Sequence, residues 1–514
     1  MRLADTRVTS EQSVPLRFEL EGPNSVAFIN RSWIFFLFVV LLFLASRIYG
    51  LIDFSLWTDE IFSLKTASLP WSDMLQRLII DKVHPPLFYV LLKIWITVGG
   101  QSLLWLKLFS FFIAAASVIP FYLLCRELNL SAGAMNIALL LASVNGYLIY
   151  YAQEVRMYGL LYFFTIVSSW LFVGYVNRAR EIDKRWLVLL FAANLLLIYT
   201  HYFGWLVVGV ENLFLLFLNR RKFWWFSLST IGLGVCFSPW VYLVVRAVLM
   251  KEGPINGLDW IERPNAHSII SFFANLCGPL DFSKSTIVRL LLFGTPILFL
   301  FWRGLRKPQF LERNFSLIKI WLLLSFVLPL VFVYAFSIFG PKSIWNERYL
   351  LIVVPSFMLL VAIALDQLRP EWLRKAMIAF AIIWATAGGI QYIERGNNLT
   401  RVAWRDMVAR MIQVEPETAR DVKIYQFETN YNRPIQYYLE ESHEQRFRAV
   451  LVDNAGEIED DHFWIAFREN RELERGLPVR EILESKGYQV NEEFSAGNIG
   501  EKTYLFSAQR LIND

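Results

Sequence analysis

Two acidic residues and a histidine in one stretch of the chain are the first candidates for chemistry. Asp59 and Glu60 follow a very apolar segment, and His84 opens a His-Pro-Pro sequence further along the same stretch. Adjacent carboxylates can act as a general base, bind an acceptor hydroxyl or hold a divalent metal ion (Mg, Mn or Zn). A structural alternative is a helix start, capped by Thr58 with acids in its first turn. We predict Asp59 and Glu60 as catalytic residues and, if a metal binds, Asp59, Glu60 and His84 as its ligands.

Two further polar patches interrupt apolar sequence, and each contains an arginine. One reads YYAQEVRMY and includes Arg156, and the other reads WNERYLL and includes Arg348. A planar guanidinium suits a phosphate group, and a helix start adds to anion binding. Structural salt bridges, and for His201 a simple turn, are the alternatives. The residues predicted to bind substrate are His84, Glu154, Arg156, Tyr158, His201, Arg348 and Tyr349.

Membrane helices are the elements that must position these residues. The chain has 514 residues, of which 56% are hydrophobic and 18% charged, whereas soluble proteins carry about 25% charged residues. The net charge of +5 is too small to indicate a nucleic-acid partner. The three cysteines show no paired spacing, so no disulfide framework or cysteine zinc site is expected. The composition therefore predicts a polytopic α-helical membrane protein.

Eleven apolar stretches approach the length that a bilayer requires, which is about 20 residues. The predicted spans are Ser32–Gly50, Leu104–Leu124, Gly133–Tyr151, Met157–Val176, Trp186–Thr200, Phe203–Leu218, Phe226–Met250, Thr286–Trp302, Ser316–Phe339, Tyr349–Leu368 and Ala376–Ile393.

Basic residues in the short loops predict the orientation, because short cytoplasmic loops are enriched in Lys and Arg. Four basic loops fall on one side if the N-terminal tail, residues 1–31, is cytoplasmic. The segment Pro86–Gly100 is short and contains Lys93, and counting it as a span would break this charge pattern. We therefore predict an outer catalytic loop, residues 53–103, in which Pro86–Gly100 is a juxtamembrane helix.

The composition changes after Ile393. Residues 398–514 are polar, with strand-like and helix-like runs in alternation, which indicates a small α/β domain. The odd number of spans places this domain outside the cytoplasm. The predicted strands are Val422–Glu428, Ala449–Asp453, Phe463–Phe467 and Thr503–Ser507, and the predicted helices are Trp404–Gln413 and Val479–Lys486.

Four motifs together resemble the GT-C superfamily of membrane glycosyltransferases. They are LWTDE ending at Glu60, HPPLFY starting at His84, YAQEVRMYGLL around Glu154, and RYLLIVVP starting at Arg348. The nearest branch contains the protein O-mannosyltransferases, the aminoarabinose transferases and the Rgt-type bacterial enzymes. The resemblance implies a GT-C fold and transfer of a sugar from a polyprenyl-phosphate carrier to a protein, lipid or polysaccharide acceptor outside the cytoplasm.

The resemblance also assigns roles to residues. Asp59 matches the family's catalytic aspartate, which deprotonates or orients an acceptor hydroxyl in an inverting transfer. His84 matches a histidine of the protein mannosyltransferases, and Glu154 matches an acid of the aminoarabinose transferases. Arg156 and Arg348, with Lys65 or Lys82, would neutralise the departing phosphate, and the lipid tail would lie between spans.

Two other classes of protein remain as alternatives. A lipid or solute transporter or flippase also needs many spans with buried charges, but repeat symmetry and broken helices near the midplane are expected of it. An O-antigen ligase or polymerase would carry its large loop between late spans. We expect a bacterial inner membrane as the location, with membrane lipids and no nucleic acid as partners. The sequence specifies neither the sugar nor the acceptor.

Overall fold

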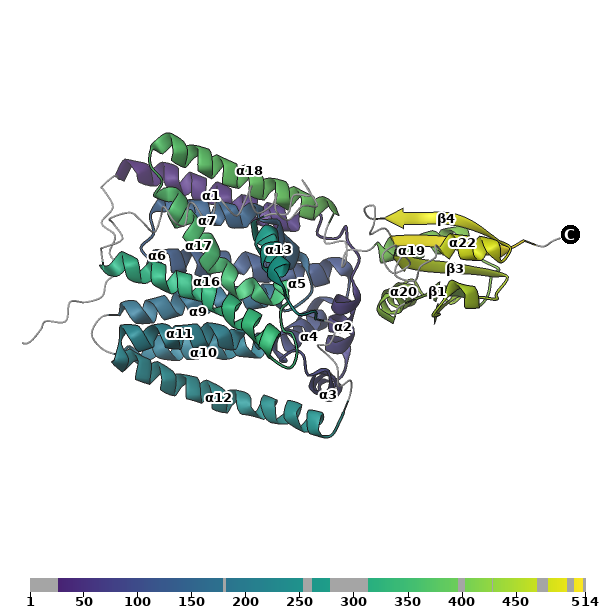
Figure 1. The fold of residues 1–514 in the computed structure, drawn as a ribbon, viewed down its shortest axis with the longest axis horizontal. Coiled ribbons are helices and arrows are strands. Elements are labelled where there is room, and N and C mark those ends of the chain that lie inside the picture. The colour runs from purple at the N-terminus through teal and green to yellow at the C-terminus, as the bar shows by residue number, and fades with distance from the viewer. Residues whose placement is uncertain are drawn as a thin grey trace, which may run out of the picture.

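The computed structural model divides the chain into a helical part and a smaller α/β part (Figure 1). It describes residues 26–178, 182–252, 261–277, 313–395, 403–427, 429–468, 479–496 and 503–511. The predicted span Thr286–Trp302 lies outside the described residues.

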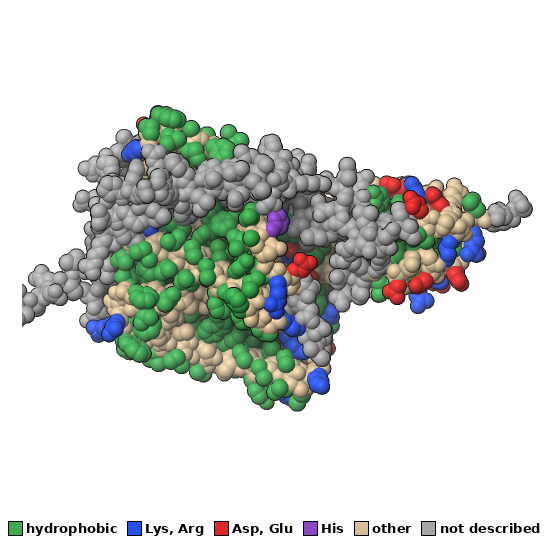
Figure 2. All heavy atoms as spheres, viewed as in Figure 1, with side chains coloured by type: hydrophobic (Ala, Val, Ile, Leu, Met, Phe, Trp, Pro, Cys, Tyr) green, Lys and Arg blue, Asp and Glu red, His purple; other side chains and the backbone are tan. Residues whose placement is uncertain are grey.

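Long helices run side by side through the helical part, and shorter helices lie at its end near the α/β part (Figure 1). Figure 2 shows hydrophobic side chains spread over the visible face of the helical part. The helices are α1 Val26–Ile48, α2 Thr58–Ser68, α3 Trp71–Asp81, α4 Leu87–Gly99, α5 Leu103–Ala116, α6 Val118–Glu127, α7 Ala132–Val144, α8 Gly146–Gln153, α9 Tyr158–Asn177, α10 Lys184–Thr200, α11 Gly204–Leu218, α12 Arg220–Leu249, α13 Ala266–Cys277, α16 Arg313–Phe339, η3 Glu347–Val353, α17 Val354–Asp366 and α18 Glu371–Arg395.

Many of these helices match the predicted spans. Within the described residues, six helices are long and apolar enough to cross a membrane, and a bent pair raises this to seven. Three further apolar segments are shorter than these helices. They are the apolar part of α1, and helices α4 and α11. α4 lies with α2 and α3 at the end of the helical part nearer the α/β part (Figure 1). The prediction of a polytopic helical membrane protein is confirmed.

One predicted span, Gly133–Tyr151, is not a single straight helix. It is broken into α7 and α8, which meet at an angle of 60°. The Asn145 side chain accepts a hydrogen bond from Leu148 N and caps α8. The buried Arg47 guanidinium donates to the carbonyls of Ala142 (2.7 Å) and Ser143 (3.1 Å) at the end of α7. Freed backbone groups need such partners where water is absent, and the bend directs the end of α8 toward the site described below.

A membrane-embedded carboxyl group is also fully partnered. Glu211 on α11 is 1% exposed. Its two oxygens bond Ser168 on α9 (2.8 Å) and Asn194 on α10 (3.1 Å). These contacts tie three helices together, so Glu211 serves packing and takes no part in the site at the end of the helical part.

The α/β part contains a five-stranded sheet of order β2-β1-β3-β5-β4. β1, β2 and β3 are parallel to one another, whereas β5 and β4 run antiparallel to their neighbours. One apolar cluster packs α19 and α20 against one face, and a second packs α22 and η4 against the other. The elements are α19 Trp404–Val414, β1 Val422–Gln426, α20 Thr429–Glu441, β2 Phe447–Leu451, η4 Ala455–Glu457, β3 His462–Arg468, α22 Val479–Ser485, β4 Tyr488–Ala496 and β5 Thr503–Arg510.

The prediction of a small α/β part is confirmed, but the sequence analysis missed helix α20, strand β4 and the short η4. Helix α20 contains Pro434, which disfavours helix by its missing N–H. The burial of Ile435, Tyr438 and Leu439 against the sheet overrides that local preference. Strand β4 carries polar residues through its middle, and in the described part of the sheet it is the edge strand, paired with β5.

Candidate functional site

An aspartate between two arginines forms the centre of the candidate site. Asp59 lies in the first turn of α2, and its side chain is 31% exposed. Its Oδ2 accepts a hydrogen bond of 3.0 Å from Arg348 at the start of η3. Arg156, from the segment between α8 and α9, lies 3.8 Å from the same oxygen. Three segments far apart in the sequence thus meet at one carboxylate.

Arg156 is held by neutral groups as well as by Asp59. Its Nη1 donates to the Ser63 hydroxyl (2.9 Å), to the Asp59 carbonyl (3.2 Å) and to the Tyr89 hydroxyl (3.4 Å). Its Nε is buried and has no hydrogen-bond partner in the described part of the chain. Since a guanidinium has five N–H donors, Arg156 keeps donor capacity for a ligand.

Glu60, although adjacent to Asp59, has a different environment. It is 1% exposed, and its Oε1 accepts from Lys107 Nζ on α5 and from Val155 N, each at 2.7 Å. Its Oε2 accepts from Trp57 N at 3.2 Å. These three bonds join α2, α5 and the segment that carries Arg156. Glu60 therefore braces the site, whereas Asp59 faces its open side.

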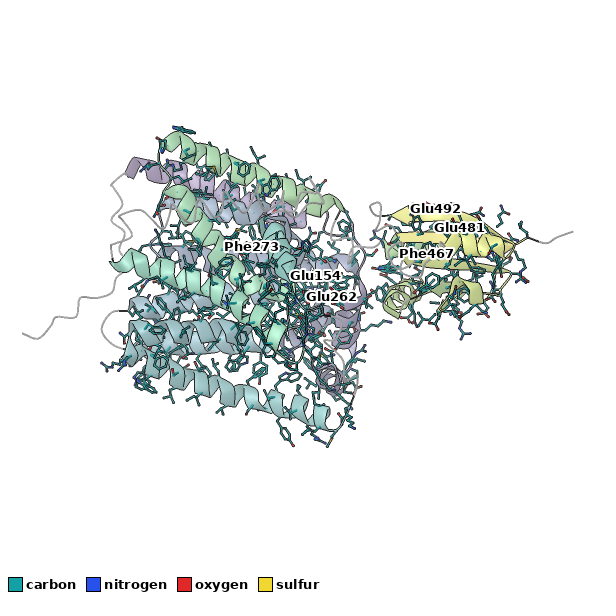
Figure 3. All side chains as sticks on the ribbon, viewed as in Figure 1. Glu154, Glu262, Phe273, Phe467, Glu481 and Glu492 are labelled. Carbon is teal, nitrogen blue, oxygen red and sulfur yellow. The ribbon has the colours of Figure 1, made fainter. Side chains whose placement is uncertain are left out.

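Glu154 is the second buried acid of the site (Figure 3). Its Oε1 accepts from the Trp57 indole N–H at 2.9 Å. Its Oε2 is buried without a hydrogen-bond partner among the described residues. Glu154, Glu60, Trp57 and Lys107 line a small pocket next to Asp59.

Two histidines lie deeper than Asp59. The rings of His84 and His201 are 6.0 Å apart, and both residues are nearly fully buried. His84 Nδ1 is 3.7 Å from the Asp81 carboxylate, and neither ring nitrogen has a hydrogen-bond partner within the described ranges. His201 Nδ1 accepts from Phe203 N at 3.2 Å.

Aromatic rings form the wall between the arginines and the histidines. The Arg348 guanidinium lies 5.5 Å from the ring centres of Trp57 and Tyr158 and 6.0 Å from that of Tyr349. The Tyr349 ring in turn lies 4.8 Å from His201. Such cation–π contacts hold a guanidinium without neutralising its charge.

The centre of the site, formed by Asp59, Arg156 and Arg348, carries net positive charge. Burial would raise the pKa of Asp59, but the charges of Arg156 and Arg348 outweigh it and hold this pKa below its ordinary value. Burial lowers the pKa of His84. Burial, His84 and the two arginines lower that of His201 well below its ordinary value, so both rings are neutral at pH 7. Two guanidiniums against one carboxylate give the centre a charge of about +1 and a preference for anions.

Within the site, Glu154 is an acid whose charge changes with pH near neutrality. Burial and the charge of Glu60 raise its pKa to about 7, against the opposing effect of the two arginines. A carboxyl group with this pKa can donate or accept a proton under physiological conditions.

The predicted metal ligands do not form one donor set. Asp59 faces two guanidiniums, Glu60 is taken up by an ammonium and two amides, and His84 lies beside Asp81 and His201. No group of three or more His, Cys, Asp or Glu side chains that could hold a metal ion occurs in the ranges that the structure describes. A divalent cation would also be repelled by Arg156 and Arg348.

The structure brings together the residues that the sequence singled out, with a few exceptions. Asp59, Arg156, Tyr158, Arg348 and Tyr349 form one cluster, which His84 and His201 border. Glu60 and Glu154 line the small adjoining pocket together with Trp57. Of the two lysines suggested for phosphate, Lys65 pairs with Glu440 and Lys82 donates to the Glu252 carbonyl.

Sequence reasoning missed Lys107 and Ser63. Lys107 is 5% exposed and is a lone basic residue near the start of an apolar helix, a signal that could have identified it. Ser63 lies one turn after Asp59 on α2 and contacts Arg156. Nothing in its local sequence distinguishes it from other helical serines.

Fold and site together define a polytopic membrane protein with a cationic, aromatic-walled site at one end of its helices. Comparison with solved structures shows which fold this is. ArnT from Cupriavidus metallidurans, bound to undecaprenyl phosphate or in the apo state, matches with a TM-score of 0.54 at 13% identity, covering 94% of this chain and 98% of that one. The chain therefore has the GT-C fold, as the sequence motifs predicted.

The chain is less similar to an oligosaccharyltransferase from Archaeoglobus fulgidus, solved with Zn and sulfate. It has a TM-score of 0.48 at 14% identity over 80% of this chain and 62% of that chain. No protein-family model matches the sequence, and no curated protein matches it either.

Proposed function

We propose that the protein is a membrane glycosyltransferase that moves a sugar from a polyprenyl-phosphate donor to an acceptor. The observation that carries the proposal is the partly exposed Asp59 carboxylate between the buried guanidinium of Arg156 and that of Arg348. A base next to two phosphate-binding groups is what such a transfer requires. The likeness to ArnT, whose structure holds undecaprenyl phosphate, adds support.

In the proposed reaction, the two arginines bind the donor and Asp59 acts on the acceptor. The donor phosphate binds Arg348 and Arg156, whose N–H groups suit phosphate oxygens. An acceptor hydroxyl hydrogen-bonds to Asp59, attacks the anomeric carbon and transfers its proton to the carboxylate. The bond from the anomeric carbon to the phosphate oxygen breaks, and the electron pair leaves with the phosphate. Because the arginines then share their charge with the phosphate, Asp59 becomes a stronger base when donor is bound.

The proposed topology is that of a transferase whose acceptor lies outside the cytoplasm. The N-terminal tail is cytoplasmic, and the site and the α/β part, residues 398–514, lie outside the cytoplasm of a bacterial inner membrane. Residues 32–397 form the catalytic membrane domain, with 53–103 as its outer loop. The acceptor is a protein, lipid or polysaccharide, and the lipid tail of the donor lies between the helices.

Sugar transfer by the purified protein tests this function. Wild type, Asp59→Asn and Asp73→Asn are incubated in detergent with a panel of polyprenyl-phosphate sugars, and glycosidic product and donor consumption are measured. Asp73 is a matched control, since it lies on the exposed side of α3. We expect Asp59→Asn to lose about 10²- to 10⁴-fold in kcat, the usual contribution of general-base catalysis, and Asp73→Asn to match wild type.

Other outcomes contradict parts of the proposal. Full activity of a folded Asp59→Asn variant would assign the base to another residue, with Glu154 next. Donor binding without turnover, together with movement of lipid across a vesicle membrane, would favour the flippase alternative.

A further inference from the structure

The α/β part contacts the backbone segment that leads into α2 and Asp59. The Leu56 N–H donates a hydrogen bond of 2.6 Å to the hydroxyl of Tyr438 on α20. Both residues are nearly fully buried, at 1% and 3% exposed. An amide at this depth has no access to water, so the Tyr438 hydroxyl is the group that satisfies it.

A second hydrogen bond holds the preceding residue. Ser55 is 3% exposed, and its hydroxyl accepts from Arg405 N at 3.0 Å. Arg405 lies in the first turn of α19, where backbone N–H groups lack partners within the helix. Helices α19 and α20 thus fix two consecutive residues of the segment from the same side.

This segment continues directly into the site. Trp57 follows Leu56, and its N–H donates to Glu60 while its indole N–H donates to Glu154. The indole ring also lies against Arg348, the residue that bonds Asp59. A displacement at Leu56 would therefore move Trp57 and the first turn of α2, which carries Asp59.

We propose that Tyr438 is a positioning residue of the transfer reaction: its hydroxyl fixes Leu56, and so the α/β part helps to place Trp57 and Asp59. The role in catalysis rests on the proposed function, whereas the structural anchoring does not. Tyr438 touches no reacting atom and acts through the backbone of Leu56.

The chain supplies a closely matched control for the test. Tyr437, next to Tyr438 on α20, is half-buried, and its hydroxyl makes no hydrogen bond within the described residues. Tyr438→Phe and Tyr437→Phe each remove one hydroxyl from the same helix. Only the first leaves a buried N–H without a partner.

Two measurements on the full-length protein in detergent follow. Amide hydrogen exchange at Leu56 should become about tenfold to hundredfold faster in Tyr438→Phe, the range expected when a buried donor loses its partner. The kcat of transfer should fall by about tenfold or more, because a small misplacement of a catalytic group is costly, while the donor KM changes little, because the phosphate-binding groups remain. Tyr437→Phe should behave as wild type in both measurements.

Ser55→Ala is the second variant, to be used if Tyr438→Phe does not fold. This variant removes the hydroxyl that accepts from Arg405 N. It should therefore also accelerate amide exchange at Leu56 and lower the kcat of transfer. Unchanged exchange at Leu56 would overturn the anchoring, and faster exchange with unchanged kcat would overturn the positioning role. If the wild type transfers no sugar from any donor, the proposed function and the role in transfer fail, while the exchange data still decide the anchoring.

Discussion

The buried pair between Lys107 and Glu60 gives the sharpest test of how the site is held together. The two charges lie 2.7 Å apart, and their side chains are 6% and 2% exposed. At an effective dielectric constant of 20, their gross attraction is about 6 kcal/mol. Desolvation offsets much of it, but removing one partner leaves an uncompensated buried charge and typically costs about 3–5 kcal/mol.

Lys107→Met should therefore lower the free energy of unfolding by about 3–5 kcal/mol. Glu60→Gln removes the other charge while an amide oxygen can still accept from Val155 N. The double variant should be more stable than the sum of the single effects predicts, with a coupling of about 1.5 kcal/mol or more. The reason is that neither charge then remains buried alone.

Denaturant titration of wild type, both single variants and the double variant in one detergent measures this cycle. Lys375→Met is the control, because Lys375 pairs with Glu371 on an exposed helix surface, and no measurable change is expected. Single effects that add to the double effect within about 0.5 kcal/mol would refute the reasoning, since independent sites behave in that way.

Two predictions concern the remaining charges of the site. The pKa of Glu154 is raised from 4.5 to about 7, so the unfolded chain loses this proton first and stability should fall as pH rises from about 4.5 to 7. Glu154→Gln should abolish that part of the pH dependence, which amounts to about 3 kcal/mol. Denaturant titrations of wild type and variant across this pH range measure it. If the free energy of unfolding changed with pH equally in both proteins, the raised pKa of Glu154 would be contradicted. Arg348→Lys should raise the donor KM about tenfold, because an ammonium cannot bind phosphate through a planar fork. Its control is Arg374→Lys on α18, a half-buried arginine that pairs with Glu371. An unchanged KM for Arg348→Lys would remove that residue from phosphate binding.

Much of the helical part could be predicted because membrane helices are specified locally. A run of about 20 apolar residues must form a helix in a bilayer, since every backbone group has to be bonded within the segment. The break between α7 and α8 could not be predicted in this way. It depends on the distant Arg47, whose guanidinium bonds the carbonyls that the break releases.

For the site too, the sequence and the tertiary structure determined different things. The sequence by itself determined which residue types were available: acids, arginines, histidines and aromatic residues at the ends of apolar runs, where ionisable groups are costly and tend to be functional. Only the tertiary structure decided which of these two adjacent acids, Asp59 or Glu60, faces the open side of the site. Asp59 and Glu60 are adjacent on α2, yet one meets Arg348 and the other Lys107. Neighbouring side chains on a helix point about 100° apart, so the partners that surround the helix determine the role of each.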